Sequence, residues 1–148
     1  MLTQLTLNSS KWSLTHYEHA LDLLSYLYET RHKGLMFRQS PQAQNRLYGY
    51  ADADLGDSPS GKSRSGKVIF FNGSLIVAKS SLQTTVSIST CTSELIALSD
   101  CAMNMQRLIN LLNELKFAQN EPCVIDEDNT ACKPYSNYLL TDYTYADY

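Results

Sequence analysis

The fold of this chain is constrained most strongly by a change in hydrophobic period along the sequence, from the two-residue alternation of strands to the spacing of a helix. Apolar and polar residues alternate from Leu47, which predicts a strand that runs to about Asp54. Two further strands are predicted over residues 67–72 and 75–78, and the Asn72-Gly73 pair between them is typical of a hairpin turn. The middle of the chain therefore predicts a series of strands, at least two of them joined by a tight turn.

The period changes to that of a helix after a crossover rich in serine and threonine. Apolar residues recur at helical spacing over residues 90–115, which predicts one long helix with an apolar stripe. Pro122 then breaks the chain, and residues 123–125 are a short apolar segment that we interpret as a fourth strand. Hairpin strands followed by a helical crossover predict an α/β fold of the α+β kind, with a mixed sheet that contains one parallel pair.

A separate helix is predicted near the beginning of the sequence. Thr15 to Glu18 fit a capping box in which Thr15 begins the helix, and apolar residues follow at helical spacing. A cluster of cations followed by Gly34 predicts the end of this helix near Lys33. Residues 38–46 are polar and contain a proline, so we interpret them as a linker.

The composition excludes several classes of protein. A chain of 148 residues, 43% hydrophobic and 18% charged, has room for one packed domain and is not typical of a disordered protein. Its apolar stretches are too short to span a bilayer and its start lacks the features of a signal peptide, so we expect an intracellular protein without membrane contact. The net charge of -3 restricts any contact with nucleic acid to a local basic patch.

Neither the cysteines nor the histidines form a pattern typical of a zinc site. The four cysteines contain no CxxC pair, and no histidine lies near them at zinc-ligand spacing. We interpret them as small hydrophobic residues in a reducing compartment. His16 and His19 are three residues apart but lack a nearby third ligand, so we expect helix-surface histidines and no structural zinc.

Three carboxylates stand where a sheet-based metal site would need them. Asp52 lies on the first predicted strand, Glu94 in the first turn of the long helix, and Asp128 at the carboxyl end of the fourth strand. Oxygen ligands of this kind suit Mg²⁺, and a metal pair can activate water for phosphodiester hydrolysis. Fifteen acidic residues also supply such triples by chance, so spacing alone favours the chance interpretation over a metal site.

Four sequence words connect these carboxylates to a known family. GYADADLGD, GKSRSGKVIFFNG, SISTCTSELIALSD and EDNTA, the last preceded by LLNELKF, occur in that order. They resemble the ribonuclease H region of copia-type retrotransposon polyproteins, which has GYxDADWAGD, KSTSGYVF, STEAEYIALSDA and CDNxxA words. The lead-in HYEHALDLLSYLYETRHKGLMF resembles that family's preceding helix. The resemblance covers about residues 12–132.

The resemblance implies a ribonuclease H-like fold, in which helices flank a mixed sheet. It also implies cleavage of the RNA strand of RNA–DNA hybrids with two Mg²⁺ ions, for which Mn²⁺ can substitute, and no small-molecule cofactor. By motif position, Asp52, Glu94 and Asp128 are the implied catalytic and metal-binding residues. Asp54 is the nearest rival to Asp52, because alternate residues of a strand share a face. The implied partners are the hybrid and the polymerase portion of the same polyprotein, in a cytoplasmic particle or the nucleus.

Nucleic-acid contacts are expected from Lys62, Arg64 and Lys67 in the loop and strand after the first carboxylate, and from Asn129 of the final word. A solvated basic loop explains the three cations equally well. The sequence therefore leaves both interpretations open.

Several positions depart from the family pattern. Leu55 and Ala78 stand where the family has tryptophans, Thr92 where it has a glutamate, and Lys116 where a glycine closes the long helix. If the helix ends in a left-handed residue, Lys116 costs roughly 1 kcal/mol relative to glycine. The family's downstream helix and fourth aspartate have no recognisable counterpart, and neither Asp142 nor Asp147 has a motif around it, so we expect an incomplete C-terminus.

We therefore divide the chain into a helical lead-in and linker at residues 1–46, a ribonuclease H-like domain at 47–133 and a divergent tyrosine-rich tail at 134–148. The leading hypothesis is a ribonuclease H segment, active or weakened. The alternatives are a catalytically dead module that binds nucleic acid or protein, and a barely folded fragment.

Overall fold

The computed structural model describes residues 12–37, 45–119, 122–127 and 129. The chain forms two compact units, Met1–Met36 and Phe37–Tyr148. Within the described residues, neither helix has the length and apolar character needed to cross a membrane.

The first unit contains helix α2, Leu14–Thr30, and no residue of that helix is buried. Its N-cap is Ser13, whose hydroxyl accepts a hydrogen bond from the backbone N–H of His16. The ring Nδ1 of His16 in turn accepts from the backbone N–H of Ser13 at 3.1 Å. The predicted start at Thr15 was therefore wrong by two residues, because a histidine ring takes the place that a glutamate has in the usual capping box.

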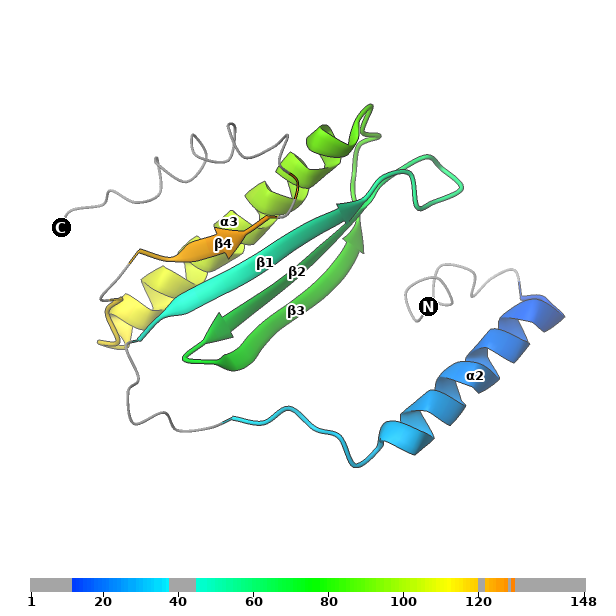
Figure 1. Cartoon of the computed structure of the whole chain (residues 1–148), viewed down its shortest axis with the longest axis horizontal. Helices are drawn as coiled ribbons and strands as arrows, with labels where there is room; N and C mark the ends of the chain where they lie inside the picture. The colour runs from blue at the N-terminus through cyan, green and yellow to red at the C-terminus, as the bar shows by residue number, and fades with distance from the viewer. Residues whose placement is uncertain (1–11, 38–44, 120–121, 128, 130–148) are drawn as a thin grey trace. The chain divides into compact units, whose positions relative to one another are not determined.

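The second unit is built on a four-stranded sheet in the order β3-β2-β1-β4 (Figure 1). β1 pairs in an antiparallel manner with β2 and in a parallel manner with β4, while β2 and β3 are antiparallel. This confirms the predicted mixed sheet with one parallel pair. The strands are β1 Leu47–Asp54, β2 Arg64–Phe71, β3 Ser74–Leu82 and β4 Val124–Asp126.

The hairpin between β2 and β3 turns where the sequence predicts it. Asn72 and Gly73 both have positive φ angles, 48° and 81°, as two-residue hairpin turns of the favoured hand require. Both strands are longer than predicted, since β2 begins at Arg64 and β3 continues to Leu82. The added residues are largely polar, and backbone pairing across the hairpin rather than apolar alternation makes them part of the sheet.

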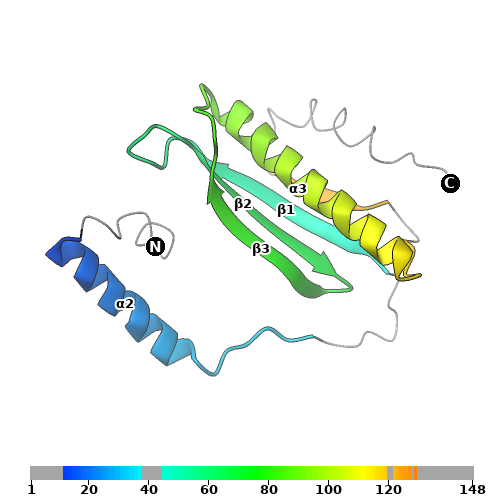
Figure 2. The same cartoon turned by 180° about the vertical axis from the view of Figure 1, so that it is seen from behind.

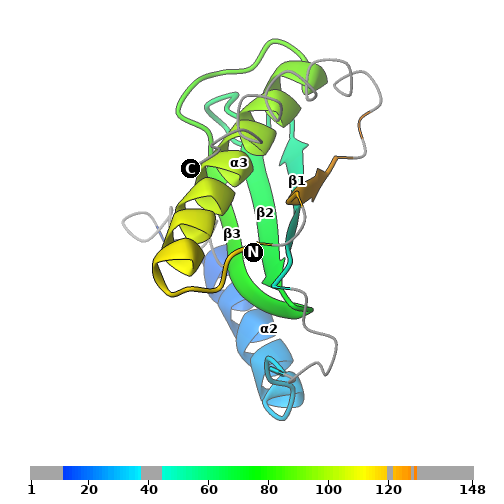
Figure 3. The same ribbon diagram turned by 90° about the vertical axis from the view of Figure 1, so that its left-hand side faces the viewer.

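One long helix, α3, spans Thr90–Glu114 and covers one face of the sheet (Figures 2 and 3). Its bounds agree with the prediction to within one residue. Ser89 caps its start by accepting from the backbone N–H of Thr92 at 3.1 Å. At its end, Lys116 has a φ of 64°, so the lysine does occupy the left-handed position expected from the family's glycine.

The core lies between α3 and the inner face of the sheet. Its fully buried members include Leu47, Ile69, Leu98 and Cys101. Gly49 allows the helix to approach β1 closely, because a Cβ atom there would lie 3.1 Å from the Met105 Cε atom and 3.1 Å from a backbone oxygen of β2. This close contact fixes the distance between α3 and the strand that carries Asp52.

The outer face of the sheet carries a cluster of aromatic rings. Tyr48 and Phe70 stack with their centroids 5.0 Å apart, and Tyr50 meets Phe70 edge to face at 6.3 Å. The inner residues Leu47, Gly49 and Ala51 alternate with them along β1.

Candidate metal and nucleic-acid site

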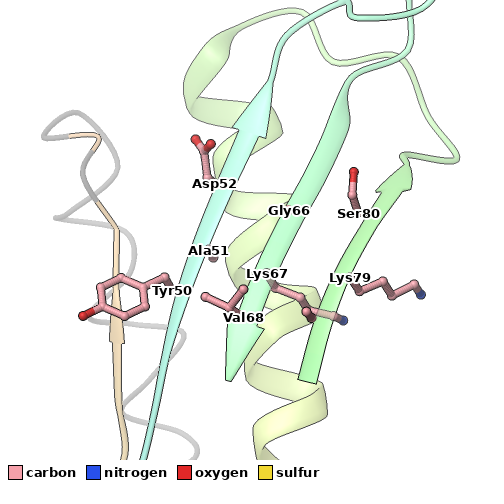
Figure 4. A pocket seen from close by; sticks show the side chains of 9 residues that line it. Tyr50, Ala51, Asp52, Gly66, Lys67, Val68, Lys79 and Ser80 are labelled. Carbon is pink, nitrogen blue, oxygen red and sulfur yellow. The ribbon is translucent and has the colours of Figure 1, made fainter. Parts of the chain in front are cut away.

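Asp52 lies on β1, directly opposite Gly66 of β2, and its side chain is exposed. Strand alternation puts it with Tyr48 and Tyr50 on the outer face, which is turned away from α3. A shallow pocket of about 460 Å³ runs across this face, and Asp52, Gly66 and Ser80 form one row across its three strands (Figure 4). Asp52 is thus open to a ligand that approaches from the outer face.

Glu94 lies in the first turn of α3 and is only 6% exposed. It belongs to the buried stripe of the helix, together with Ala97 and Leu98 of the following turn. The sequence placed this carboxylate correctly on the helix, but nothing in its polar surroundings predicted that it would be buried.

The remaining sequence-predicted carboxylate, Asp128, lies outside the described residues. β4 pairs in parallel with β1 and ends at Asp126, opposite Tyr50. Asp52 and Glu94 approach β1 from opposite sides, because α3 packs on the inner face. Over residues 12–37, 45–119, 122–127 and 129, no three His, Cys, Asp or Glu side chains gather closely enough to hold a metal ion. Convergence of the three carboxylates therefore stays a prediction.

The expected phosphate contact at Lys67 needs correction. Its side chain is 3% exposed and turned inward, beneath α3. The Nζ atom lies 2.6 Å from Asp100 Oδ2 and donates also to the Asp100 backbone oxygen at 3.2 Å. Lys67 pairs in the sheet with Ala51, so strand alternation points it into the core rather than toward solvent. We therefore remove it from the candidate phosphate contacts.

The other nucleic-acid candidates differ in how far they are engaged within the protein. Arg64 forms an ion pair with Asp57, and both side chains are largely buried. Lys62 is half-buried in the loop before β2, where its backbone N–H donates to Ser58 Oγ at 3.0 Å. Asn129 is half-buried and its backbone N–H donates to Glu127 Oε1 at 3.1 Å. Of the two cations in this group, Arg64 has an ion-pair partner, whereas Lys62 forms no ion pair with any residue that the structure describes.

The cysteines among the described residues fit their interpretation as small hydrophobic side chains. Cys101 is fully buried in the core, and desolvation raises the pKa of its thiol to about 11. The nearby Lys67 opposes this rise and Asp100 adds to it. Burial also raises the pKa of Cys123. Cys132 lies outside the described residues.

A buried polar network at the start of α3 was not anticipated from the sequence. It centres on Gln83, which is 5% exposed, and includes Ser65, Ser87 and Ser93. Its members are spread over β2, the crossover and α3, so the serine-rich composition alone did not indicate which of these residues meet. Gln83 follows a largely polar run of residues at the end of β3, so the sequence offers no clear signal that it is buried.

No protein-family model matches the chain. Among curated proteins, it is 29% identical over 123 residues to the transposon Ty1-DR5 Gag-Pol polyprotein of Saccharomyces cerevisiae, a match that covers 82% of this chain. It is 30% identical over the same length to the Ty1-JR1 Gag-Pol polyprotein of that yeast. The chain spans about 6% of the length of these relatives. Its homologues are thus copia-type retrotransposon Gag-Pol polyproteins, which agrees with the family suggested by the four sequence words.

Proposed function

We propose that this chain corresponds to the ribonuclease H segment of a retrotransposon polyprotein and cuts the RNA strand of RNA–DNA hybrids. The observation that supports the proposal is that two carboxylates selected by the family's sequence motifs lie on a strand and on the helix that packs against that strand. Asp52 lies near the carboxyl end of β1, and Glu94 lies in the first turn of the helix that packs on the same strand. The Gag-Pol homologues supply the polyprotein context, in which the polymerase portion is the proposed partner.

The proposed metal site uses Asp52 near the carboxyl end of β1, Glu94 in the first turn of α3, and Asp128, which follows β4 in the sequence. Parallel pairing of these strands favours such a site, because the ends of parallel neighbours lie at the same edge of a sheet. The proposal requires that Asp52, exposed on the outer face, and Glu94, on the helix that covers the inner face, reach the same ions around this edge. The donor set consists of carboxylate oxygens, which Mg²⁺ prefers, and two such ions would activate water and stabilise the leaving oxygen.

Cleavage of a labelled RNA–DNA hybrid in Mg²⁺, and then in Mn²⁺, tests this proposal. Asp52→Asn removes a proposed metal ligand, whereas Asp54→Asn removes an exposed carboxylate two residues along the same strand. We expect Asp52→Asn to abolish cleavage above background and Asp54→Asn to retain most of it. Equal loss in both variants, or cleavage that persists without a divalent ion, would contradict the assignment.

A second candidate function is a binding module that contacts nucleic acid or protein without cutting. It is favoured by the placement of the two described carboxylates, since Asp52 and Glu94 approach β1 from opposite sides. Because the net charge is -3 and both Lys67 and Arg64 form ion pairs within the protein, hybrid contact by such a module would depend on Lys62. Hybrid binding without cleavage in either metal, reduced by Lys62→Ala, would favour this function over the nuclease.

A further inference from the structure

Gln83 has a buried side chain that forms hydrogen bonds to β2, to the crossover and to the first turn of α3. It follows the last residue of β3 and begins the crossover to α3, and only 5% of it is exposed. Its backbone N–H donates to the Ser63 backbone oxygen at 2.8 Å. Because this bond involves only the backbone, it remains available when the side chain is replaced.

The Gln83 amide connects three parts of the fold through hydrogen bonds of 2.9 Å. Its Nε2 atom donates to Ser65 Oγ on β2 and to the backbone oxygen of Ser93 in the first turn of α3. Its Oε1 atom accepts from Ser87 Oγ in the crossover. Both amide hydrogens and the amide oxygen thus have partners, so the orientation of the side chain is fully determined.

The Ser93 oxygen that Gln83 binds belongs to the peptide group that joins Ser93 to Glu94. Ser93 is completely buried, and its own hydroxyl donates to the Thr90 backbone oxygen at 2.7 Å. A hydrogen bond to this peptide group from the sheet side limits rotation of the first helical turn about its axis. Such rotation would displace the carboxylate of Glu94, which is buried in this same turn.

A second tie fixes α3 further along its length. Lys67 of β2 binds both the carboxylate and the backbone oxygen of Asp100. Gln83 and Lys67 thus each form polar contacts with α3. These contacts restrict the rotation of α3 about its axis more than apolar contacts alone would, because apolar contacts are not directional.

We propose that Gln83 is a positioning residue, whose amide orients the first turn of α3 and thereby holds the Glu94 carboxylate at the metal site. This inference rests on the proposed function, because it assumes that Glu94 binds a divalent ion. Residues that hydrogen-bond to metal ligands commonly change metal affinity ten- to a hundredfold when they are removed, and Gln83, which binds the backbone next to Glu94, is expected at the lower end of that range. Gln83→Met keeps a side chain of similar length but removes all three side-chain hydrogen bonds.

The test uses the full chain and two measurements. Mn²⁺ affinity is determined by titration for the unchanged protein, Glu94→Gln and Gln83→Met, and backbone amide exchange is measured over residues 93–97. We expect Gln83→Met to weaken Mn²⁺ binding about tenfold or more and to accelerate exchange in that turn. Ile69→Val, which lowers stability from within the core of β2, is the matched control and should leave Mn²⁺ affinity within about twofold.

The two proposals fail in different ways. If Glu94→Gln weakens Mn²⁺ binding but Gln83→Met does not, the positioning role is wrong and the metal site stands. If Glu94→Gln has no effect, the metal site is wrong, and the exchange measurement alone decides whether Gln83 orders the helix start. If Gln83→Met does not fold, Ser65→Ala removes one partner of the amide. Unchanged exchange and Mn²⁺ affinity in that variant would overturn the inference.

Discussion

The ammonium group of Lys67 lies 2.6 Å from the carboxylate of Asp100, and this ion pair joins β2 to the middle of α3. The two partners are unequally exposed, at 3% for the lysine side chain and 34% for the aspartate. Asn104 supports the aspartate by donating to its backbone oxygen at 2.8 Å. Removal of either partner should therefore have unequal consequences.

We expect Asp100→Ala to lower the free energy of unfolding by about 2–4 kcal/mol, because it leaves a buried ammonium group with one backbone acceptor. Lys67→Met should cost less than about 1 kcal/mol, since water reaches the carboxylate of Asp100 and the methionine fills the lysine's apolar volume. Urea unfolding of both variants measures the difference. Equal losses would show that burial of the lysine does not determine the cost.

Gly49→Ala should lower the free energy of unfolding by about 1–3 kcal/mol, because the added methyl group would crowd Met105 and a backbone oxygen of β2. Gly66→Ala is the matched control on the neighbouring strand, where the nearest atom to an added Cβ is 3.8 Å away. That substitution should change stability little. Thermal unfolding compares the two, and a Gly49→Ala protein as stable as Gly66→Ala would mean that α3 can shift without cost.

Lys116→Gly should raise the free energy of unfolding by about 0.5–1 kcal/mol, since glycine adopts the left-handed conformation at φ 64° without the steric penalty of a lysine. Glu114→Gly, in the last turn of α3, should lower it by a similar amount because that residue is helical. The opposite signs provide an internal check by urea unfolding. A loss of stability in Lys116→Gly would contradict the strain assigned to the helix end.

Cys101 should resist alkylation in the folded protein at pH 8, because its pKa of about 11 leaves almost no thiolate. The half-buried Cys91 is the comparison, and mass spectrometry of the digested protein separates the two sites. Equal labelling of both cysteines would contradict the burial of Cys101.

The raised pKa of Cys101 also makes the stability of the protein depend on pH. Since the thiol ionises more readily in the unfolded chain, its contribution to stability is complete below pH 9 and is lost as pH rises from about 9 to 11.

Local patterns predicted most of the fold of the second unit. The Asn72-Gly73 turn, the long helix and β1 were all predicted from signals carried within a few residues of each position, namely φ preference and hydrophobic period. The ends of β2 and β3 were predicted less well. Their outer residues are polar, and they become strand only because the opposite strand supplies backbone partners.

The candidate site was likewise predicted only in part from local sequence patterns. Motif position selected Asp52, Glu94 and Asp128, and the structure describes the first two on the predicted strand and helix. The sequence assigned Lys67 to phosphate binding because it stood in a run of cations, but strand alternation across the sheet points it toward Asp100. A charge pattern along the chain does not reveal which side chains face a helix that lies far away in sequence.

The sequence by itself determined where the elements of the second unit form and which family words they carry, because helix period, turn conformation and motif spacing are local properties. Only the tertiary structure decided which polar residues are buried together. Gln83 meets Ser93, and Lys67 meets Asp100, across separations of 10 and 33 residues. Such contacts depend on how α3 is rotated and placed on the sheet, and that placement results from all the core contacts acting together.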